Sequence, residues 1–429
     1  MKILLKQGRV IDPAQDLDSV MDVFINGNVI EKIDRKISAA KDDIQVIDAS
    51  NYIVAPGLID VHAHLREPGY EYKETIKTGT AAAIKGGYTT IVCMANTNPV
   101  NDNRSVTEAI VEKAKSEGVC RVFSCGSITK DLKGEELSEI GDMYAAGIVA
   151  ISDDGRSVRN AALLRKAMEY IKLFGIPVIS HCEDEDLSRG FVHEGIASLL
   201  SGIDAVPSIA EEIIVQRDIA IGAYTGSHIH LTHISTAGSV KAISHFKKLY
   251  GKITCDTCPH YFSLTDEATL TFDTNTKVNP PLRSRADMEA IKEGLRNGSI
   301  DIIATDHAPH ELTSKDVEYN LASSGISGLE TAFSLSLSLV HEGILSMKEL
   351  LCKLTVNPAK MLRLPYGEIS PGKHADLIVF DPDKEWTVDP ASFISKGKNT
   401  PFGGWKLKGK NLLTIVDGAV VYKDNEFRR

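Results

Sequence analysis

Residues 58–64 read LIDVHAH, a short run of branched apolar residues that ends in two histidines. Helical stretches such as residues 105–118 and 161–175 separate this run from others like it. Seven further runs follow: TTIVCMANT (89–97), RVFSCGSI (121–128), IVAISDD (148–154), PVISHCE (177–183), IHLTHIS (229–235), ITCDTCPH (253–260) and DIIATDHAPH (301–310). Strands that alternate with helices form parallel sheets, so eight such units predict an α/β fold, a (β/α)8 barrel of the TIM type. A doubly wound sheet is the alternative, but no glycine-rich phosphate loop follows the first run.

The two ends of the chain differ from this middle part and resemble each other. Both contain short runs in which apolar and polar residues alternate between turn signals, which is typical of antiparallel strands. These runs are ILLKQGRVID (3–12), DVFINGNVIEKI (22–33), IQVIDASNYIV (44–54), ADLIVFDPD (375–383) and LLTIVDGAVVY (412–422). Because each piece is marginal alone, we expect residues 1–53 and 367–429 to form one small composite β-sandwich, with the barrel at residues 54–366.

The composition is that of an ordinary globular protein. The chain has 429 residues, 43% of them hydrophobic, and a net charge of −10 from 48 basic and 58 acidic side chains. It has no long basic run, which argues against nucleic-acid binding, and no run near the roughly 18 apolar residues of a membrane span. Seven scattered cysteines, an odd number, suggest reduced thiols. We therefore expect a cytoplasmic protein with neither a membrane nor a nucleic-acid partner.

Metal-ligand residue types end five of the eight predicted strands. His62 and His64 lie two residues apart in a strand, so their side chains face the same side. The other strand ends carry Asp153-Asp154, His181, His233 and Asp306-His307. The alternative is a solvated polar rim. Counting one aspartate from each of the doublets Asp153-Asp154 and Asp306-His307, four histidines and two carboxylates exceed the needs of one tetrahedral ion, but they suit two divalent ions about 3.5–4 Å apart that share a bridging carboxylate and hydroxide. The pattern predicts metal-assisted hydrolysis.

Three segments resemble a known family. DVHAHLREPG (60–69) and ATDHAPHELTSK (304–315) closely resemble the two signature segments of dihydroorotases of the amidohydrolase superfamily, and GEISPGKHADLIVFD (367–381) is similar to the superfamily's C-terminal segment. The Arg-Glu-Pro-Gly form resembles the class I branch. The resemblance covers essentially the whole chain. It implies reversible cyclisation of N-carbamoyl-L-aspartate to L-dihydroorotate in de novo pyrimidine (UMP) biosynthesis, by attack of a metal-bridged hydroxide.

The resemblance also implies a set of metal ligands, for two Zn²⁺ per subunit. One zinc would be held by His62, His64 and Asp306, the other by His181 and His233, and Asp154 would bridge them or bind alongside. Many relatives use a carboxylated lysine as the bridge. No lysine stands between Gly147 and Arg156, so a carbamate is not available at this strand end. The family's motif position favours Asp154 over Asp153, which is expected to pack or cap.

Further residues are assigned to catalysis and substrate binding. A carboxylate beside the metal can act as general acid and base, so Asp306 is the predicted proton shuttle; the alternative is that it serves only as a ligand. Arg66 follows His64 by two residues and has the planar fork that suits a carboxylate. The resemblance adds further substrate contacts from His64, Asn96, Asn279, His310, Ser324 and Gly325.

One loop departs from the family pattern. The dihydroorotases that this chain resembles often carry Pro-Phe-Gly where it has Ser323-Ser324-Gly325. Residues 311–328 are long and polar enough for a mobile cover over the site. A backbone contact from Gly325 survives the change, whereas packing by the missing aromatic ring does not.

Other functions and features are weighed against this interpretation. Relatives act on hydantoins, dihydrouracil or allantoin, but Arg66 and His310 favour a substrate with a carboxylate. A non-catalytic scaffold for aspartate transcarbamoylase is the other alternative, and the complete ligand set argues against it. We expect a homodimer that can associate with aspartate transcarbamoylase as an active partner. Cys255 and Cys258 are interpreted as strand packing, and His228 and His230 as local polar contacts.

Overall fold

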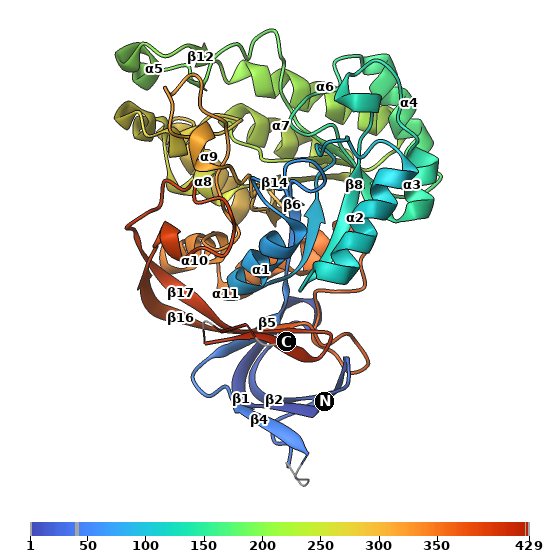
Figure 1. Cartoon of the computed structure of the whole chain (residues 1–429), viewed down its shortest axis with the longest axis vertical. Coiled ribbons are helices and arrows are strands. Elements are labelled where there is room, and N and C mark those ends of the chain that lie inside the picture. Colours follow the sequence, from blue (N-terminus) through green and yellow to red (C-terminus); the bar gives the residue numbers. More distant parts are fainter. Residues whose placement is uncertain (1, 39–42, 425, 428–429) are drawn as a thin grey trace.

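The computed structural model describes residues 2–38, 43–424 and 426–427. Its central unit is a parallel eight-stranded sheet that curls into a barrel (Figure 1). The strands follow chain order around it: β6 (Leu58–Ala63), β7 (Tyr88–Cys93), β8 (Arg121–Gly126), β9 (Ile148–Ile151), β10 (Val178–Ser180), β13 (Ile229–Leu231), β14 (Ile253–Thr257) and β15 (Ile302–Ile303). Each of the eight predicted runs contains one of these strands or most of it. The predicted barrel is confirmed.

The barrel closes between its first and last strands. Ala63 at the end of β6 forms a parallel bridge with His307, just beyond β15. The backbone N–H of His64 donates to the carbonyl of His307 at 2.8 Å. These contacts bring the two signature segments of the sequence side by side, although more than 200 residues separate them.

Helices cover the outside of the barrel. They are α1 (Ile76–Gly86), α2 (Arg104–Glu117), α3 (Ile140–Ala146), α4 (Ala161–Ile171), α6 (Ile209–Thr225), α7 (Ala237–Lys247), α9 (Arg285–Arg296), α10 (Ala332–His341), α11 (Met347–Leu354) and α12 (Val356–Leu362). Helix α4 illustrates why they form. Leu164, Ala167, Met168 and Ile171 are buried at helical spacing, and the Asn160 side chain caps the first turn. Two short helices, α5 (Ile196–Ser201) and α8 (Pro259–Ser263), and the ribbon of β11 (Val192–His193) and β12 (Ala205–Val206) lie in the connections.

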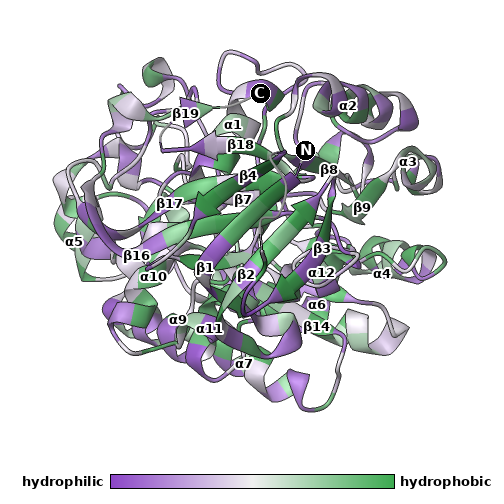
Figure 2. Cartoon of the chain, turned by 90° about the horizontal axis from the view of Figure 1, so that it is seen from below, coloured by the Kyte–Doolittle hydropathy of each residue, from purple (hydrophilic) through white to green (hydrophobic). Residues whose placement is uncertain are grey.

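Both chain ends contribute to a second, nine-stranded sheet, as predicted. Its strands are β1 (Lys2–Asp12), β2 (Leu17–Asn26), β3 (Val29–Asp34), β4 (Ile44–Asp48), β5 (Ile53–Pro56), β16 (Leu377–Thr387), β17 (Lys406–Val416), β18 (Ala419–Lys423) and β19 (Glu426–Phe427). The two ends join where β5 pairs antiparallel with β16, from Ile53 opposite Phe380 to Pro56 opposite Leu377. Figure 2, seen from below, shows the mainly hydrophobic strands of this composite sheet in front of the ring of helices.

The composite sheet has its own apolar core, separate from that of the barrel. Ile3, Val10, Val54, Leu377 and Ile415 are fully buried within it. The domain boundaries predicted at 53/54 and 366/367 stay predictions. Within the described residues, no helix combines the length and apolar character needed to span a bilayer.

Candidate active site and metal centre

The predicted site residues converge at the carboxyl end of the barrel. His62 and His64 lie at the end of β6, and the others follow the ends of β9, β10, β13 and β15. A cavity of about 230 Å³ opens there. Every predicted substrate-binding residue lines it, namely His64, Arg66, Asn96, Asn279, His310, Ser324 and Gly325. Asp154, His181, His233 and Asp306 line it too, while His62 lies behind them, 1% exposed.

The Asp154 carboxylate lies between two pairs of histidines. Its Oδ2 atom is 3.3 Å from Nε2 of His62 and 3.5 Å from Nε2 of His64. Its Oδ1 atom is 3.5 Å from Nδ1 of His181 and 3.4 Å from Nε2 of His233. Each oxygen therefore faces one pair, which is the arrangement that a carboxylate shared by two cations needs.

The Asp306 carboxylate faces only the first of these pairs. Its Oδ1 atom is 3.3 Å from Nε2 of His64 and 3.5 Å from Nε2 of His62. These three residues form one compact set of potential ligands, and His62, Asp154 and His233 form a second. Cys258 and His260 form a third set with Asp306. The sequence alone predicts strand packing for Cys258 and does not predict that it lies close to Asp306.

The electrostatics of the cluster favour a bound cation. Burial alone would lower the pKa of His62, but the carboxylates of Asp154 and Asp306 outweigh burial and raise it to about 10. Conversely, burial would raise the pKa of Asp306, yet His62 and His64 hold it well below its usual range. Nε2 of His62 and Oδ1 of Asp154 are buried without a hydrogen bond to any described residue. Four imidazoles and two carboxylates with such unsatisfied atoms fit divalent metal ions of the zinc type.

A hydrogen-bonded chain behind the cluster fixes the orientation of His62. The Thr232 hydroxyl donates to Oδ2 of Asp256 at 2.9 Å and lies 2.7 Å from Nδ1 of His62. The same carboxylate accepts from Nε2 of His230 at 2.8 Å and from the backbone N–H of His233 at 2.6 Å. Since a carboxylate only accepts, the Thr232 oxygen must accept from Nδ1–H of His62. In the neutral ring the proton is therefore on Nδ1, and Nε2 is the nitrogen that would face a metal once the ion has displaced the second proton.

His64 is oriented in the same way by a different residue. Its Nδ1 atom is 2.9 Å from Oδ1 of Asn96. An amide oxygen only accepts, so Nδ1 carries the proton and Nε2 is left free toward Asp154 and Asp306. Asn96, predicted as a substrate contact, thus orients His64, a predicted metal ligand.

Glu183 is a site residue that the sequence reasoning missed. Its Oε2 atom is 3.0 Å from Nε2 of His181 and accepts a hydrogen bond from Nδ2 of Asn279, also at 3.0 Å. Burial would raise the pKa of Glu183, but His181 lowers it to about 2. The available signal was its position two residues after His181, which places both side chains on the same side of an extended segment.

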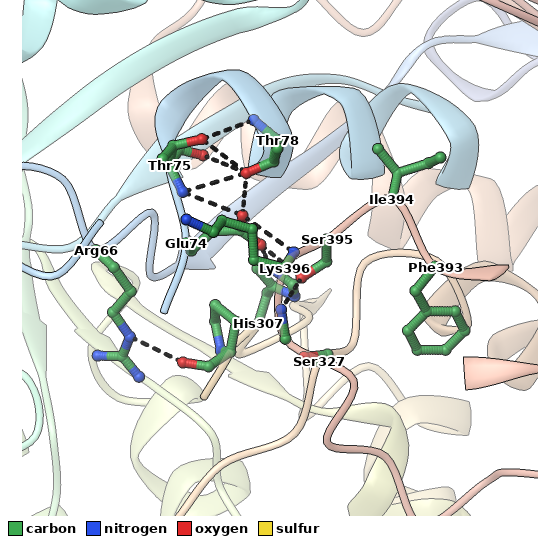
Figure 3. A network of polar contacts seen from close by, with 12 residues as sticks. Arg66, Glu74, Thr75, Thr78, His307, Ser327, Phe393, Ile394, Ser395 and Lys396 are labelled. Atoms are coloured by element: carbon green, nitrogen blue, oxygen red, sulfur yellow. Dashed lines mark hydrogen bonds and ion pairs between the residues drawn. The ribbon is translucent and has the colours of Figure 1, made fainter. Parts of the chain in front are cut away.

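Buried Glu74 supports the segment that carries Asp306, and it too was missed (Figure 3). Its Oε2 atom is 3.3 Å from Nε2 of His307 and accepts from the Ser395 hydroxyl at 2.5 Å. The other ring nitrogen of His307 accepts from the backbone N–H of Gly328 at 3.1 Å. Since His307 follows Asp306 directly, this network fixes the backbone beside the predicted proton shuttle.

Asp153 points away from the cluster. Its Oδ1 atom accepts from the backbone N–H groups of Ile128 at 2.7 Å and Thr129 at 3.0 Å. Asp153 thus caps the segment that follows β8. A packing or capping role is what we expect of the aspartate in the Asp153-Asp154 pair that does not bind metal.

Arg66 supplies positive charge to the cavity wall. Its Nε atom donates to the carbonyl of Pro309 at 3.4 Å, and Nη2 lies 3.5 Å from Nε2 of His310. Among the described residues, no carboxylate lies within ion-pair distance of this guanidinium. His310 is neutral, because burial and the adjacent Arg66 lower its pKa to about 2. An unpaired guanidinium beside a neutral imidazole can receive a carboxylate from a ligand.

Ser324 and Gly325 lie in the wall of the cavity, next to His310. The carbonyl of Ser324 accepts from Nε2 of His310 at 2.9 Å. Gly325 has a φ of 138°, and a Cβ at this position would lie 2.6 Å from that of Ala308. Buried Lys315 ties the loop together by donating to the carbonyl of Ser323 at 2.6 Å. The mobile-cover role of this loop stays a prediction.

Comparisons with known proteins agree with this architecture. The sequence matches the Amidohydrolase family over residues 53–421. It is 50% identical over 426 residues to the protein named Dihydroorotase from Syntrophus aciditrophicus, with 99% of this chain and all of that protein covered. The Dihydroorotase of Geobacter metallireducens is 50% identical over 424 residues, at 99% and 100% coverage.

Solved structures with the same architecture include two enzymes of other names. The L-hydantoinase (dihydropyrimidinase) from Arthrobacter aurescens has a TM-score of 0.90 at 24% identity, covering 100% of this chain and 97% of that one. Dihydropyrimidinase from Brevibacillus agri has a TM-score of 0.87 at 23% identity, covering 100% and 96%. At such low identity, this likeness shows the fold alone.

The family match across most of the chain places this protein in the amidohydrolase family. Its relatives at half identity over the full length are named dihydroorotases. The chain resembles that group along its whole length, and it is a cyclic amidohydrolase.

Proposed function

We propose that this protein is a dihydroorotase, which interconverts N-carbamoyl-L-aspartate and L-dihydroorotate in pyrimidine biosynthesis. The observation that carries the proposal is the position of Arg66. Its guanidinium lines the same cavity as Asp154 and Asp306, and among the described residues it has no carboxylate partner. A small cyclic amide with a carboxylate substituent suits such a cavity. The names of the relatives at 50% identity support the same substrate.

The donor set supports two zinc ions as the cofactor. His62, His64 and Asp306 would hold one ion, His181 and His233 the other, and Asp154 would serve both. Such ions lower the pKa of water toward about 7 and polarise a carbonyl group when they are bound. Thr232 and Asn96 hold the Nδ1 protons of His62 and His64, which leaves Nε2 of each ring as the nitrogen that would bind a metal.

Asp306 is the proposed proton shuttle of the reaction. In ring opening, water adds its oxygen to the amide carbonyl carbon of dihydroorotate, and the carboxylate of Asp306 takes the water proton. The same group then gives that proton to the ring nitrogen as the C–N bond breaks. Cyclisation is the reverse. The low pKa of Asp306 keeps it ionised at neutral pH, as a proton acceptor must be.

Arg66 is the proposed partner of the substrate carboxylate, through paired charge-assisted hydrogen bonds. Asn96, His310 and Asn279 line the same cavity, and the Asn279 amide donates to Glu183. The backbone of Ser324 and Gly325 completes the wall. Substrates without a carboxylate would leave the Arg66 charge unpaired, which disfavours hydantoin, dihydrouracil and allantoin.

The test is turnover of L-dihydroorotate beside dihydrouracil, hydantoin and allantoin, before and after chelation. We expect activity on dihydroorotate that chelation removes and zinc restores. Arg66→Met should raise KM for dihydroorotate by about tenfold to a hundredfold, the value of a charged hydrogen bond. Arg104→Met, on the exposed face of α2, is the matched control. Turnover confined to uncharged rings would refute the substrate, and no turnover by zinc-loaded protein would favour the scaffold alternative.

We also propose a cytoplasmic homodimer that can associate with aspartate transcarbamoylase. Light scattering of the purified protein, alone and mixed with the transcarbamoylase, tests both assemblies. A monomer at micromolar concentration would contradict the first, and unchanged mass in the mixture would contradict the second.

A further inference from the structure

A second cavity lies at the opposite end of the barrel from the candidate active site. Its volume is about 430 Å³. It is bounded by the last residue of α4, the amino ends of β13 and β14, and α12 with the residue that caps it. In the view from below, α4, α6 and α12 are labelled near one another beside the composite sheet (Figure 2). No role in the proposed reaction falls to this cavity.

Positive charge dominates its wall. Lys172, Lys252, Lys360 and Arg363 all line it. Lys172 and Lys252 donate to backbone carbonyls, those of Thr225 at 2.8 Å and Gly226 at 2.9 Å, so their charges are not neutralised. Lys360 and Arg363 form no ion pair within the described part of the chain.

The acidic residue among the described lining residues, Asp301, is already engaged. It forms an ion pair with Lys247 and accepts from the backbone N–H of Cys255 at 2.8 Å. The cavity therefore carries an excess of positive charge in a chain whose net charge is −10. Four cations converging on a concave surface focus the field on an anion there.

The remaining wall is apolar or neutral. Ile171, Ile176 and Met361 are buried side chains that line the cavity. His228 also lines it, and burial is the main cause that lowers its pKa to about 4, so its ring adds no charge at neutral pH. A volume of this size accommodates a small molecule, and an apolar wall with a few charged groups is the usual composition of such sites.

We propose that this cavity binds a small molecule that carries one or more phosphate groups. The phosphates would meet the four cations at the mouth, and an organic body would cover the apolar wall. Both a free inorganic anion and a phosphorylated organic molecule share the phosphate chemistry, and the charge and the apolar wall together favour the organic molecule.

The polar residues next to this cavity continue toward the candidate active site. Nε2 of His228 is 2.9 Å from the Thr254 hydroxyl, which is 2.8 Å from Nδ1 of His230. Nε2 of His230 in turn donates to Asp256, the carboxylate behind Thr232 and His62. A ligand in the cavity would thus lie beside one end of a chain of hydrogen bonds that reaches a proposed metal ligand.

The test is isothermal titration of the zinc-loaded, full-length protein with inorganic phosphate, pyrophosphate and adenosine diphosphate. The comparison is Lys252→Glu/Lys360→Glu, which reverses two exposed charges of the cavity. We expect at least about tenfold weaker binding in this variant, because each reversal turns an attraction into a repulsion. Lys248→Glu, an exposed lysine outside the cavity, is the matched control and should bind as the parent does.

The outcomes separate the sources of phosphate. Tighter binding of adenosine diphosphate than of pyrophosphate, which has the same number of phosphates, would support an organic ligand, whereas equal affinities would assign the site to a free inorganic anion and overturn the organic part of the proposal. No binding by the parent, or equal binding by the charge-reversed variant, would overturn the site itself. Lys252→Gln/Lys360→Gln serves if charge reversal impairs folding, and unchanged basal turnover verifies that either variant is intact.

Discussion

Replacing Thr232 with valine tests whether the hydrogen-bonded chain behind the proposed metal centre determines zinc binding. Valine keeps the shape of threonine but removes the hydroxyl between Nδ1 of His62 and Oδ2 of Asp256. Asp256 keeps its bonds to His230 and His233, whereas Nδ1–H of His62 is left buried without a partner. An unsatisfied buried donor costs about 1–3 kcal/mol, and loss of a group that orients a ligand histidine weakens metal binding about 10–100-fold.

Competition with a chromogenic chelator measures the zinc affinity of the parent, Thr232→Val and Thr232→Ser. We expect Thr232→Val to bind zinc about 10–100-fold more weakly and to unfold at a lower urea concentration. Thr232→Ser keeps the hydroxyl and should bind within a few-fold of the parent. Equal affinity in Thr232→Val and the parent would refute the reasoning, and so would a serine variant as weak as the valine variant, because then the methyl group and not the hydroxyl would matter.

Three further predictions concern the proton shuttle, a buried lysine and the loop over the cavity. Asp306→Asn should keep bound zinc, measured by atomic absorption, yet lose about 10²–10⁴-fold in kcat; near-parental turnover would show that Asp306 is only a ligand. Burial, and then Lys277, lower the pKa of Lys315 from 10.5 to about 7. Between these values the unfolded chain binds the extra proton, so the Lys315 contribution to the unfolding free energy rises with pH across this window, and Lys315→Met should flatten that rise in urea titrations. Gly325→Ala should lower the unfolding free energy by about 1–3 kcal/mol, because a φ of 138° strains any residue with a Cβ; an unchanged urea midpoint would argue against that strain.

The sequence was enough to predict the barrel and the convergence of its polar strand ends. Each run from residue 58 to residue 310 combines branched apolar residues with a polar end, and parallel strands bring all such ends to one rim. His62, His181 and Asp306 are therefore brought together by topology, although no two of them are close in the chain.

The supporting carboxylates could not be predicted, because their partners are distant in sequence. Glu74 lies in the polar stretch YEYKET, which looks like exposed surface, yet it is fully buried against His307 and Ser395. Asp256 stands between Cys255 and Cys258, and nothing in the neighbouring sequence indicates its hydrogen bonds to Thr232 and His230. Nor does spacing distinguish Asp153 from Asp154, since both follow β9 and both are buried.

The junction between β5 and β16 sets an order of events during synthesis of the chain. Ile53 pairs with Phe380, so the apolar edge of β5 stays open while more than 300 residues emerge from the ribosome. At the usual 5–20 residues per second, this takes roughly 15–65 s. An open strand edge can pair with a neighbouring chain, so nascent copies on one messenger are exposed to each other throughout that interval. Closure of the composite sheet thus removes the open edge of β5 and ends the interval in which this strand can pair with another copy of the chain.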